Sequence, residues 1–514
     1  MNDSANKIQN GAFLPRKRHE YRLLWSMLLG VMTLFDASAA YALPTFVVNS
    51  TRDAVDATPG DGLCATTNTN VHECTLRAAI MELSALNFSS TGFGTVVLAS
   101  GVTYTLTTKG PNEDDGRSGD LDIKMPMTIK SSGAGAAIVR GSSGWNDRIF
   151  HIKTFLFDFS VTVVGIEIQN GHPDGLGGGI LIEDSRVQLT NSTVSANFSL
   201  SGGGIAIRGT VRDSVLVLDS STVSGNTAEA KNGTKGGTSG DGGGIWTSGL
   251  GAFAFVNSTI SGNKGMGNGG GIFLSAPLGS LNANNVTIAK NVADSDSDAI
   301  GDGGGIFVAA GTVRLANTIV AGNLDLSTTT NRADCAGTIS SLGFNLVQNA
   351  TGCILAGATT GNITGRDPLL GSLQNNGGPT FTHALQKGVI AQFFSPAIDV
   401  GSTATSGDSA CLLKDQRGVT RPLDGNGDFI VRCDIGAFEA PPPSSSLGLP
   451  SLEPVETSIY PAEHVIYNFA WTVPGPSWRV LDNLQLRIRD EQGVAFWVYF
   501  QQVAGSQGTF SLMR

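Results

Sequence analysis

Two short motifs alternate through the middle of this 514-residue chain, and their spacing constrains the fold more than any other feature. One is Gly-Gly-Gly-Ile, and the other resembles Asn-Ser-Thr-Val/Ile-Ser-Gly-Asn. The first ends at Ile180, Ile205, Ile245, Ile272 and Ile306, and the second at Asn197, Asn226, Asn263, Asn291 and Asn323. Consecutive terminal asparagines are 28 to 37 residues apart. Periods of this length are typical of solenoids.

Each repeat carries short alternating apolar runs, such as Ile180-Leu181-Ile182. Runs of three to six residues broken by Gly and Asn predict strands and not helices. One such unit per turn gives an all-β, parallel β-helix, in which each strand pairs with the coils on either side of it. Gly and Asn tolerate the left-handed backbone of tight corners. We therefore expect the terminal asparagines to form a structural ladder of side chains inside the solenoid.

The repeat varies in length at one corner only. From each motif isoleucine to the next motif asparagine the spacing is nearly constant. From each motif asparagine to the following motif isoleucine the number of residues varies, and the long insertions are at 227–241 and 292–302. Insertions on one face of a solenoid often mark its binding face. The short corner at Lys264 lies between the two insertions, so the loops are predicted to bound a notch. Lys231, Lys235 and Lys264 are its candidate ligand-binding residues.

The second insertion is acidic. Asp294, Asp296, Asp298 and Asp302 stand at positions 1, 3, 5 and 9 of the loop, and flexible acidic loops suit Ca²⁺, which takes six to eight oxygen ligands. Ala299 and Gly305 replace the glycine and glutamate of an EF-hand. A solvated polar turn is the alternative. Ca²⁺ is the one cofactor that the sequence suggests, and no haem or nucleotide motif is present.

The N-terminal 42 residues predict export. A basic stretch around Arg16–Arg22 precedes an apolar run over 23–35, and Ala40-Tyr41-Ala42 matches a signal-peptidase site. The alternative, a membrane anchor, needs about 20 apolar residues, and no later segment is long enough. A formal charge of −10 disfavours a nucleic-acid partner. We expect a secreted or cell-surface protein.

Six cysteines in an exported chain predict disulfides. Pairing each with its neighbour closes three short loops, Cys64–Cys74, Cys335–Cys353 and Cys411–Cys433, of a kind worth about 2–4 kcal/mol each. Metal ligation is the alternative, but there is no Cys-x-x-Cys and histidine is sparse. We favour the three sequential disulfides.

Two flanking regions carry a family resemblance. Cys74-Thr75-Leu76-Arg77-Ala78-Ala79-Ile80 opens a predicted amphipathic helix over 74–84 and resembles the Cys-Ser-Leu-Arg-Glu-Ala-Ile motif (CSLREA) of an exported bacterial family, from which Thr75 and Ala78 depart. Downstream, five motifs at 367–371, 376–380, 395–399, 415–418 and 434–439 resemble the choice-of-anchor Q module, which commonly follows a right-handed parallel β-helix. Together the resemblances cover roughly residues 45–440. They imply fold and export, and the function of such families is mostly uncharacterised.

These features divide the chain into six predicted segments. They are a signal peptide (1–42), an N-terminal cap with a helix over the first coil (43–110), the β-helix (111–365), the choice-of-anchor Q-like module (366–440), a Pro/Ser linker (441–452) and a small β-sandwich-like module (453–514).

Function is the least constrained property. The fold hosts pectin-cleaving enzymes, but the Gly-His-Gly and Arg-Ile-Lys motifs of polygalacturonases are absent, and Arg186, Arg208 and Arg314 are candidate lyase bases by residue type only. A long ladder face with inserted loops favours binding or adhesion to a glycan or cell surface. A polysaccharide lyase or hydrolase is the enzymatic alternative, and a spacer that presents the C-terminal module is the structural one.

Overall fold

A computed structural model describes residues 43–67, 72–86, 93–111, 113–154, 160–229, 240–327, 331–386, 394–428 and 430–442, and the backbone of five further strands between 449 and 512. The predicted signal peptide and the linker residues 443–448 lie outside the described residues. No helix in the described part of the chain is long and apolar enough to cross a membrane.

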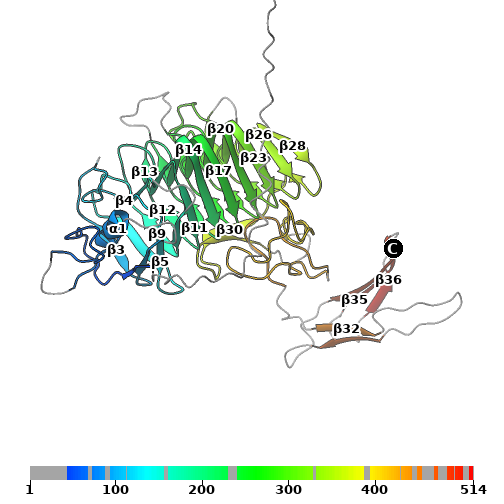
Figure 1. Cartoon of the computed structure of the whole chain (residues 1–514). Coiled ribbons are helices and arrows are strands. Elements are labelled where there is room, and N and C mark those ends of the chain that lie inside the picture. Colours follow the sequence, from blue (N-terminus) through cyan, green and yellow to red (C-terminus); the bar gives the residue numbers. More distant parts are fainter. Residues whose placement is uncertain are drawn as a thin grey trace, which may run out of the picture. The chain divides into compact units, whose positions relative to one another are not determined.

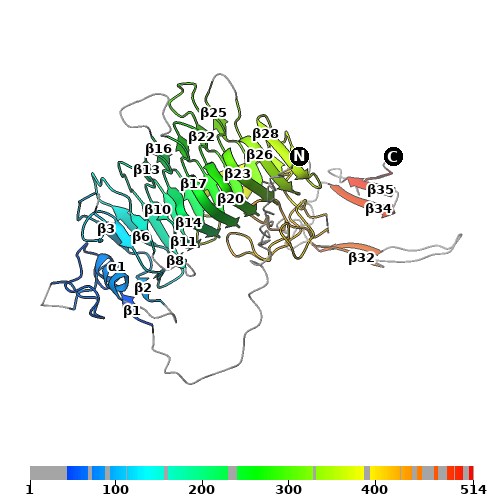
Figure 2. The same cartoon turned by 45° about the horizontal axis from the view of Figure 1, so that its top comes forward.

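The body of the chain is a right-handed parallel β-helix, as predicted, whose coils are stacked in sequence order from β3 beside α1 to β28 at the opposite end (Figures 1 and 2). Three parallel sheets form its faces. Sheet 1 comprises β1 (Thr45–Val47), β2 (Thr95–Leu98), β4 (Leu121–Ile123), β5 (Thr128–Ser131), β7 (Phe150–Ile152), β8 (Ser160–Val164), β10 (Ile180–Glu183), β11 (Arg186–Thr190), β14 (Ile205–Asp219), β17 (Ile245–Val256), β20 (Ile272–Asn284), β23 (Ile306–Ala316), β26 (Cys335–Leu342) and β28 (Cys353–Ala358). Sheet 2 comprises β3 (Thr103–Leu106), β6 (Ala137–Gly141), β9 (Ile166–Gln169), β12 (Thr193–Ser195), β15 (Thr222–Ser224), β18 (Thr259–Ser261), β21 (Thr287–Ala289), β24 (Ile319–Ala321), β27 (Leu346–Val347) and β29 (Ile363–Thr364). Sheet 3 comprises β13 (Phe198–Ser199), β16 (Thr227–Ala228), β19 (Lys264–Gly265), β22 (Val292–Ala293) and β25 (Leu324–Asp325).

The motif isoleucines point inward and pair coil to coil, Ile205 with Ile245 and Ile245 with Ile272, and all three are buried. The glycines before them allow the coils to approach closely. Gly202 has a left-handed φ of 65°, and a Cβ at Gly204 would lie 2.9 Å from the amide nitrogen of Asn226. The Gly-Gly-Gly-Ile motif therefore supplies a tight corner and then room for the asparagine ladder.

The predicted asparagine ladder is present. The Nδ2 atom of each ladder asparagine donates to Oδ1 of the next, at 2.9–3.0 Å from Asn197 to Asn323. All five residues are buried. The ladder satisfies polar groups at a corner where the strands end and thereby fixes the register of the coils.

The helix α1 (Leu76–Ala85) lies within the predicted 74–84 region to within one or two residues. Thr75 is its N-cap and accepts the backbone N–H of Ala78, so the departure from serine in the motif keeps the capping hydroxyl. The strands β1, β2 and β3 already pair with later coils. The region predicted as a separate cap therefore contains the first coil of the solenoid as well as the helix.

The described residues of 366–440 pack along sheet 2, with a short antiparallel hairpin of β30 (Leu370–Gln374) and β31 (Thr382–Leu385). Gln416, from the motif at 415–418, is central to this contact. Its side chain accepts the hydroxyl of Thr259 at 2.6 Å and donates to that of Thr222 at 2.9 Å. The five motifs of this module therefore include residues that attach it to the coils.

The structure contains the three predicted disulfides, Cys64–Cys74, Cys335–Cys353 and Cys411–Cys433. Beyond 448 the backbone forms two antiparallel sheets, consistent with a small β module. They consist of β32 (Leu449–Glu453) with β33 (Asn468–Thr472), and of β34 (Asn483–Asp490) with β35 (Gly493–Gln501) and β36 (Thr509–Leu512). Because β32 starts at Leu449, the predicted linker ends sooner than expected.

Candidate functional site

The corner predicted to form a notch carries sheet 3. Lys264 is exposed in β19 and pairs with Thr227 of one neighbouring coil and Val292 of the other. It therefore lies between the two insertions, as the spacing indicated. Lys231 and Lys235 lie outside the described residues, so the other side of the notch stays a prediction.

Three of the four aspartates in the acidic loop come together. One carboxylate oxygen each from Asp294, Asp296 and Asp298 lies within 4.8 Å of the others. Asp294 is buried, and its two oxygens accept the backbone N–H groups of Asp298 and Ala299 at 2.9 and 3.1 Å. Asp294 thus closes the loop. Asp296 is exposed, whereas Asp298 is half-buried and its Oδ1 accepts the backbone N–H of Ile300 at 3.0 Å.

Asp302 does not belong to this acidic group. Its Oδ2 is 3.1 Å from Nη1 of Arg332, and its backbone N–H donates to Oδ1 of Asn268 at 3.0 Å. The prediction of four clustered aspartates is therefore wrong for Asp302, because the ion pair with Arg332 directs its carboxylate elsewhere.

A charged group that no sequence motif predicts lies on the outward face of sheet 1. Asp122 on β4, His151 on β7 and Glu183 on β10 come from successive coils. The imidazole joins the two carboxylates, with Nδ1 3.1 Å from Asp122 and Nε2 3.1 Å from Glu183. Arg208 on β14 extends the line, with its Nε 2.7 Å from Glu183.

This arrangement fixes the charge of the histidine. Burial lowers the pKa of His151, but the hydrogen bonds to Asp122 and Glu183 outweigh it and raise the pKa to about 9. The hydrogen bond from His151 lowers the pKa of Glu183 to about 2. At neutral pH the group is therefore an imidazolium between two carboxylates. Both ring nitrogens are engaged, so the geometry favours an electrostatic clamp between coils.

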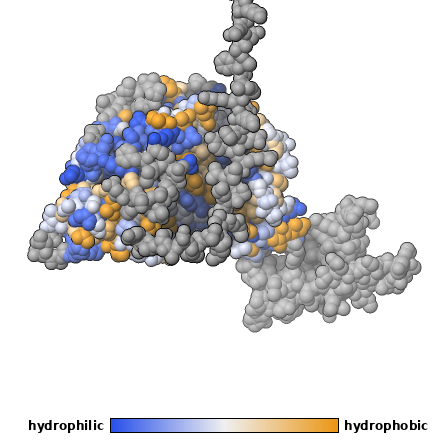
Figure 3. Space-filling view, viewed as in Figure 1, coloured by the Kyte–Doolittle hydropathy of each residue, from blue (hydrophilic) through white to orange (hydrophobic). Residues whose placement is uncertain are grey.

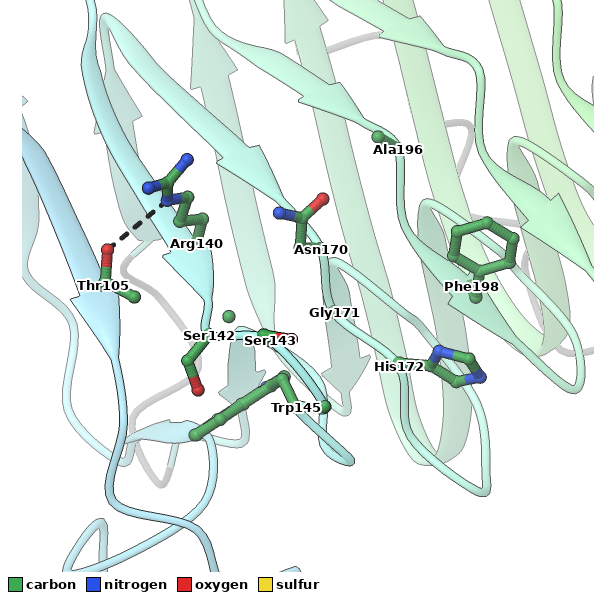
Figure 4. A pocket seen from close by; sticks show the side chains of 12 residues that line it. Thr105, Arg140, Ser142, Ser143, Trp145, Asn170, Gly171, His172, Ala196 and Phe198 are labelled. Carbon is green, nitrogen blue, oxygen red and sulfur yellow. Dashed lines mark hydrogen bonds between the residues drawn. The ribbon is translucent and has the colours of Figure 1, made fainter.

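A cleft of about 520 Å³ opens at the corner between sheets 2 and 3 (Figure 4). We call it the aromatic cleft. The rings of His172 and Phe198 stack on one side of it, with centroids 5.3 Å apart and planes 22° apart. On the other side Nε of Arg140 donates to Oγ1 of Thr105 at 3.4 Å. Trp145 lies below them in this view.

The polar lining of the aromatic cleft comes from neighbouring corners. Ser142, Ser143 and Asn170 contribute hydroxyl and amide groups. Asn170 has a left-handed φ of 58°, and it is exposed, as are His172 and Arg140. Figure 3 shows hydrophilic surface, in blue, over the upper left of the coils, where Figure 1 labels β13, the strand of Phe198. The lining combines ring faces with hydrogen-bonding groups.

Trp145 holds the floor of this cleft in place. Its side chain is buried, and Nε1 donates to the backbone carbonyl of Arg148 at 3.1 Å. The guanidinium of Arg148 in turn lies 3.2 Å from Asp120. Among the described residues that line the cleft, none carries a carboxylate. The lining therefore offers ring faces for stacking and polar groups for hydrogen bonding.

No protein-family profile matches the chain, and no curated protein matches it. Among solved structures, the crystal structure of pectate lyase Pel9A matches at 14% sequence identity with a TM-score of 0.42, over 77% of this chain and 97% of that chain.

Proposed function

We propose that this protein is exported and binds a glycan in the aromatic cleft. The observation that carries the proposal is the stack of His172 on Phe198 opposite the polar groups of Arg140 and Asn170. Sugar rings present apolar C–H faces and a rim of hydroxyls. Ligand sites commonly combine aromatic faces with a few placed polar groups, and such a lining complements both parts of a sugar.

The repeat supports a chain-like ligand. Adjacent coils are about 4.8 Å apart, so corner residues such as Asn170, Ala196 and Gly225 recur along the solenoid axis. A polysaccharide lying along this axis meets a similar corner at each coil. The aromatic cleft would hold one part of that chain, and the predicted notch around Lys264 lies on the same solenoid.

A glycan array probed with the full-length mature protein, followed by calorimetry on the best ligand, tests the proposal. Removing the stack in the His172→Ala/Phe198→Ala variant should weaken binding by up to about tenfold per ring, since aromatic contacts contribute about 0.5–1.5 kcal/mol each. Phe307→Ala is the matched control. It removes one ring of another stack, that of Phe273 and Phe307 on sheet 1, with centroids 5.6 Å apart.

Three outcomes would contradict the proposal. Equal affinity of wild type and the double variant would place any glycan site elsewhere. Release of unsaturated or reducing products from a panel of pectins and alginates would show that the protein is a lyase or hydrolase and not only a binding protein. Absence of both binding and products would leave the spacer alternative.

A further inference from the structure

A second cleft, of about 810 Å³, lies between sheet 2 and the β30–β31 hairpin. Its floor is a row of outward side chains at equivalent positions of three coils, Ser195, Ser224 and Ser261. The hairpin supplies His383 and the carbonyl of Gly371. This cleft forms only because residues 366–440 pack on the coils, so residues far apart in the sequence meet in it.

Ser261 and His383 are hydrogen-bonded across this cleft, with Oγ 2.8 Å from Nε2. The other ring nitrogen, Nδ1, is 2.7 Å from the carbonyl oxygen of Gly371. A carbonyl oxygen can only accept, so Nδ1 carries the proton and Nε2 presents its lone pair. The hydroxyl of Ser261 therefore donates to Nε2. A nucleophile, a base and a group that orients the base are thus joined by two successive hydrogen bonds.

The surroundings keep the imidazole neutral. Burial lowers the pKa of His383, the charge of Lys290 lowers it further, and the hydrogen bond to Gly371 only partly opposes them. Glu167 and Lys290 are the other titratable groups among the described residues that line this cleft. A neutral imidazole at pH 7 can accept the serine proton, and the ammonium of Lys290 supplies positive charge to the cleft.

The remaining lining indicates the kind of molecule that fits. Leu370, Leu373 and Phe381 form an apolar side, and Thr193 with the serines forms a hydroxyl-lined side. A short acyl chain matches the first and a polyhydroxylated alcohol the second. Ala196 lines both this cleft and the aromatic cleft, so the two clefts adjoin at this residue.

We propose that Ser261 and His383 are the nucleophile and base of an ester-hydrolase site for short-chain acyl esters of carbohydrate hydroxyls. Oγ of Ser261 attacks the acyl carbon and its proton passes to Nε2 of His383. The bond to the alcohol oxygen then breaks, and His383 returns the proton to that oxygen. Water attacks the acyl-serine, its proton passes through His383 to Oγ, and the carboxylic acid is released. The carbohydrate part of the substrate rests on the proposed function above, whereas the ester chemistry does not.

The first test is covalent labelling of the full-length mature protein with a fluorophosphonate probe, mapped by peptide mass spectrometry. The expected label is on Ser261. Labelling should fall in the acid limb as His383 becomes protonated, with its midpoint below the ordinary histidine value of about 6.5. No label, or a label on another serine, overturns the assignment, and this readout on the wild type requires no variant to fold.

The second test is hydrolysis of 4-nitrophenyl acetate, and of acetylated against deacetylated xylan and pectin with acetate as the measured product. Ser261→Ala and His383→Gln should each lower kcat/KM by at least about 100-fold. Ser275→Ala, at a serine on β20 of sheet 1 outside this cleft, should retain activity, and thermal midpoints check folding. Activity on the nitrophenyl ester without acetate release from glycans would overturn only the carbohydrate part. Activity unchanged in Ser261→Ala would overturn the site.

Discussion

The side-chain amide of Asn323 donates to Oδ1 of Asp334 at 2.9 Å, and with this contact the asparagine ladder ends. Every ladder member donates through Nδ2 to the next, and every member after Asn197 accepts through Oδ1 from the one before, so the ladder has a direction. Its last position needs only to accept. Asp334 meets that need, since Oδ2 accepts the backbone N–H of Asn349 at 2.7 Å as well. An aspartate therefore fits this end and no interior position.

This direction predicts that Asn263→Asp destabilises the protein more than Asn263→Ala does. Nδ2 of Asn263 donates to Oδ1 of Asn291 and to the carbonyl of Val223, and a carboxylate would place an oxygen against both acceptors. Each buried polar group left unsatisfied costs about 1–3 kcal/mol. Urea unfolding measures the difference. Asn146→Asp, on an exposed asparagine, is the control, and equal costs for Asn263→Asp and Asn263→Ala would show that the direction of the ladder does not matter.

The ladder was predictable because its members recur in a motif, whereas its end was not. Asp334 follows Asn323 by only 11 residues and stands outside the repeat. The strands were also predictable. The alternating apolar runs and the Gly and Asn corners specify their local structure, and pairing between coils then reinforces it. The disulfide pairs were predictable because each joins cysteines close in sequence.

The candidate sites were much less predictable. The aromatic cleft joins residues from four coils without a motif, and the Ser261–His383 contact spans 122 residues. Asp122, His151 and Glu183 carry no shared sequence pattern, although each occupies an outward position of its strand once the register is known. The one available signal was a histidine flanked by inward-facing apolar residues in Phe150–Ile152. Such contacts depend on register and on packing of the module, which spacing alone does not give.

The charged group on sheet 1 predicts a loss of stability in mild alkali. His151 has a pKa raised from 6.5 to about 9, so its contribution is fully present below pH 6.5 and is lost as the pH rises through about 9. The loss amounts to about 3 kcal/mol at most. Unfolding free energies between pH 6.5 and 9.5 should show it, and the His151→Gln variant should not. His172→Gln, on an exposed histidine, should behave as the wild type, and an equal alkaline loss in His151→Gln would contradict this assignment.

The lowered pKa of Glu183 predicts a loss of stability at acid pH. Its pKa is lowered from 4.5 to about 2, so its contribution is present above pH 4.5 and is lost as the pH falls through about 2. Glu183→Gln should therefore flatten the acid limb of the stability profile. Asp115→Asn, on an exposed carboxylate whose pKa is lowered by Lys124, is the control. An unaltered acid limb in Glu183→Gln would show that other carboxylates determine acid unfolding.

At the N-terminal end of the solenoid, we expect substitution of Arg77 to cause the largest single loss of stability. Its guanidinium is buried, pairs with Asp53 at 2.6 Å and donates to the carbonyls of Gly116, Gly119 and Asp120. Arg77→Met keeps the packed stem but leaves the Asp53 carboxylate without its charge partner, and breaking such a buried pair costs about 3–5 kcal/mol. Thermal unfolding should show this loss, whereas Arg117→Met, on an exposed arginine, should change little. A loss below about 1 kcal/mol in Arg77→Met would contradict the role of Arg77 in joining the helix to the first coil.

In the acidic loop, substitutions of different aspartates should distinguish stabilisation by hydrogen bonds within the loop from stabilisation by bound Ca²⁺. Asp294 caps backbone N–H groups inside the loop, so Asp294→Ala should lower the thermal midpoint equally in EDTA and in millimolar Ca²⁺. Asp296 and Asp298 are the less buried carboxylates of the cluster, and Ca²⁺ at about 100 times its Kd should stabilise the wild type by about 2.7 kcal/mol. That gain should disappear in Asp296→Ala/Asp298→Ala and persist in Asp302→Asn, because Asp302 pairs with Arg332. If the wild type and the Asp296→Ala/Asp298→Ala protein respond alike to Ca²⁺, or neither responds, the loop is a polar turn closed by the hydrogen bonds of Asp294 and Asp298.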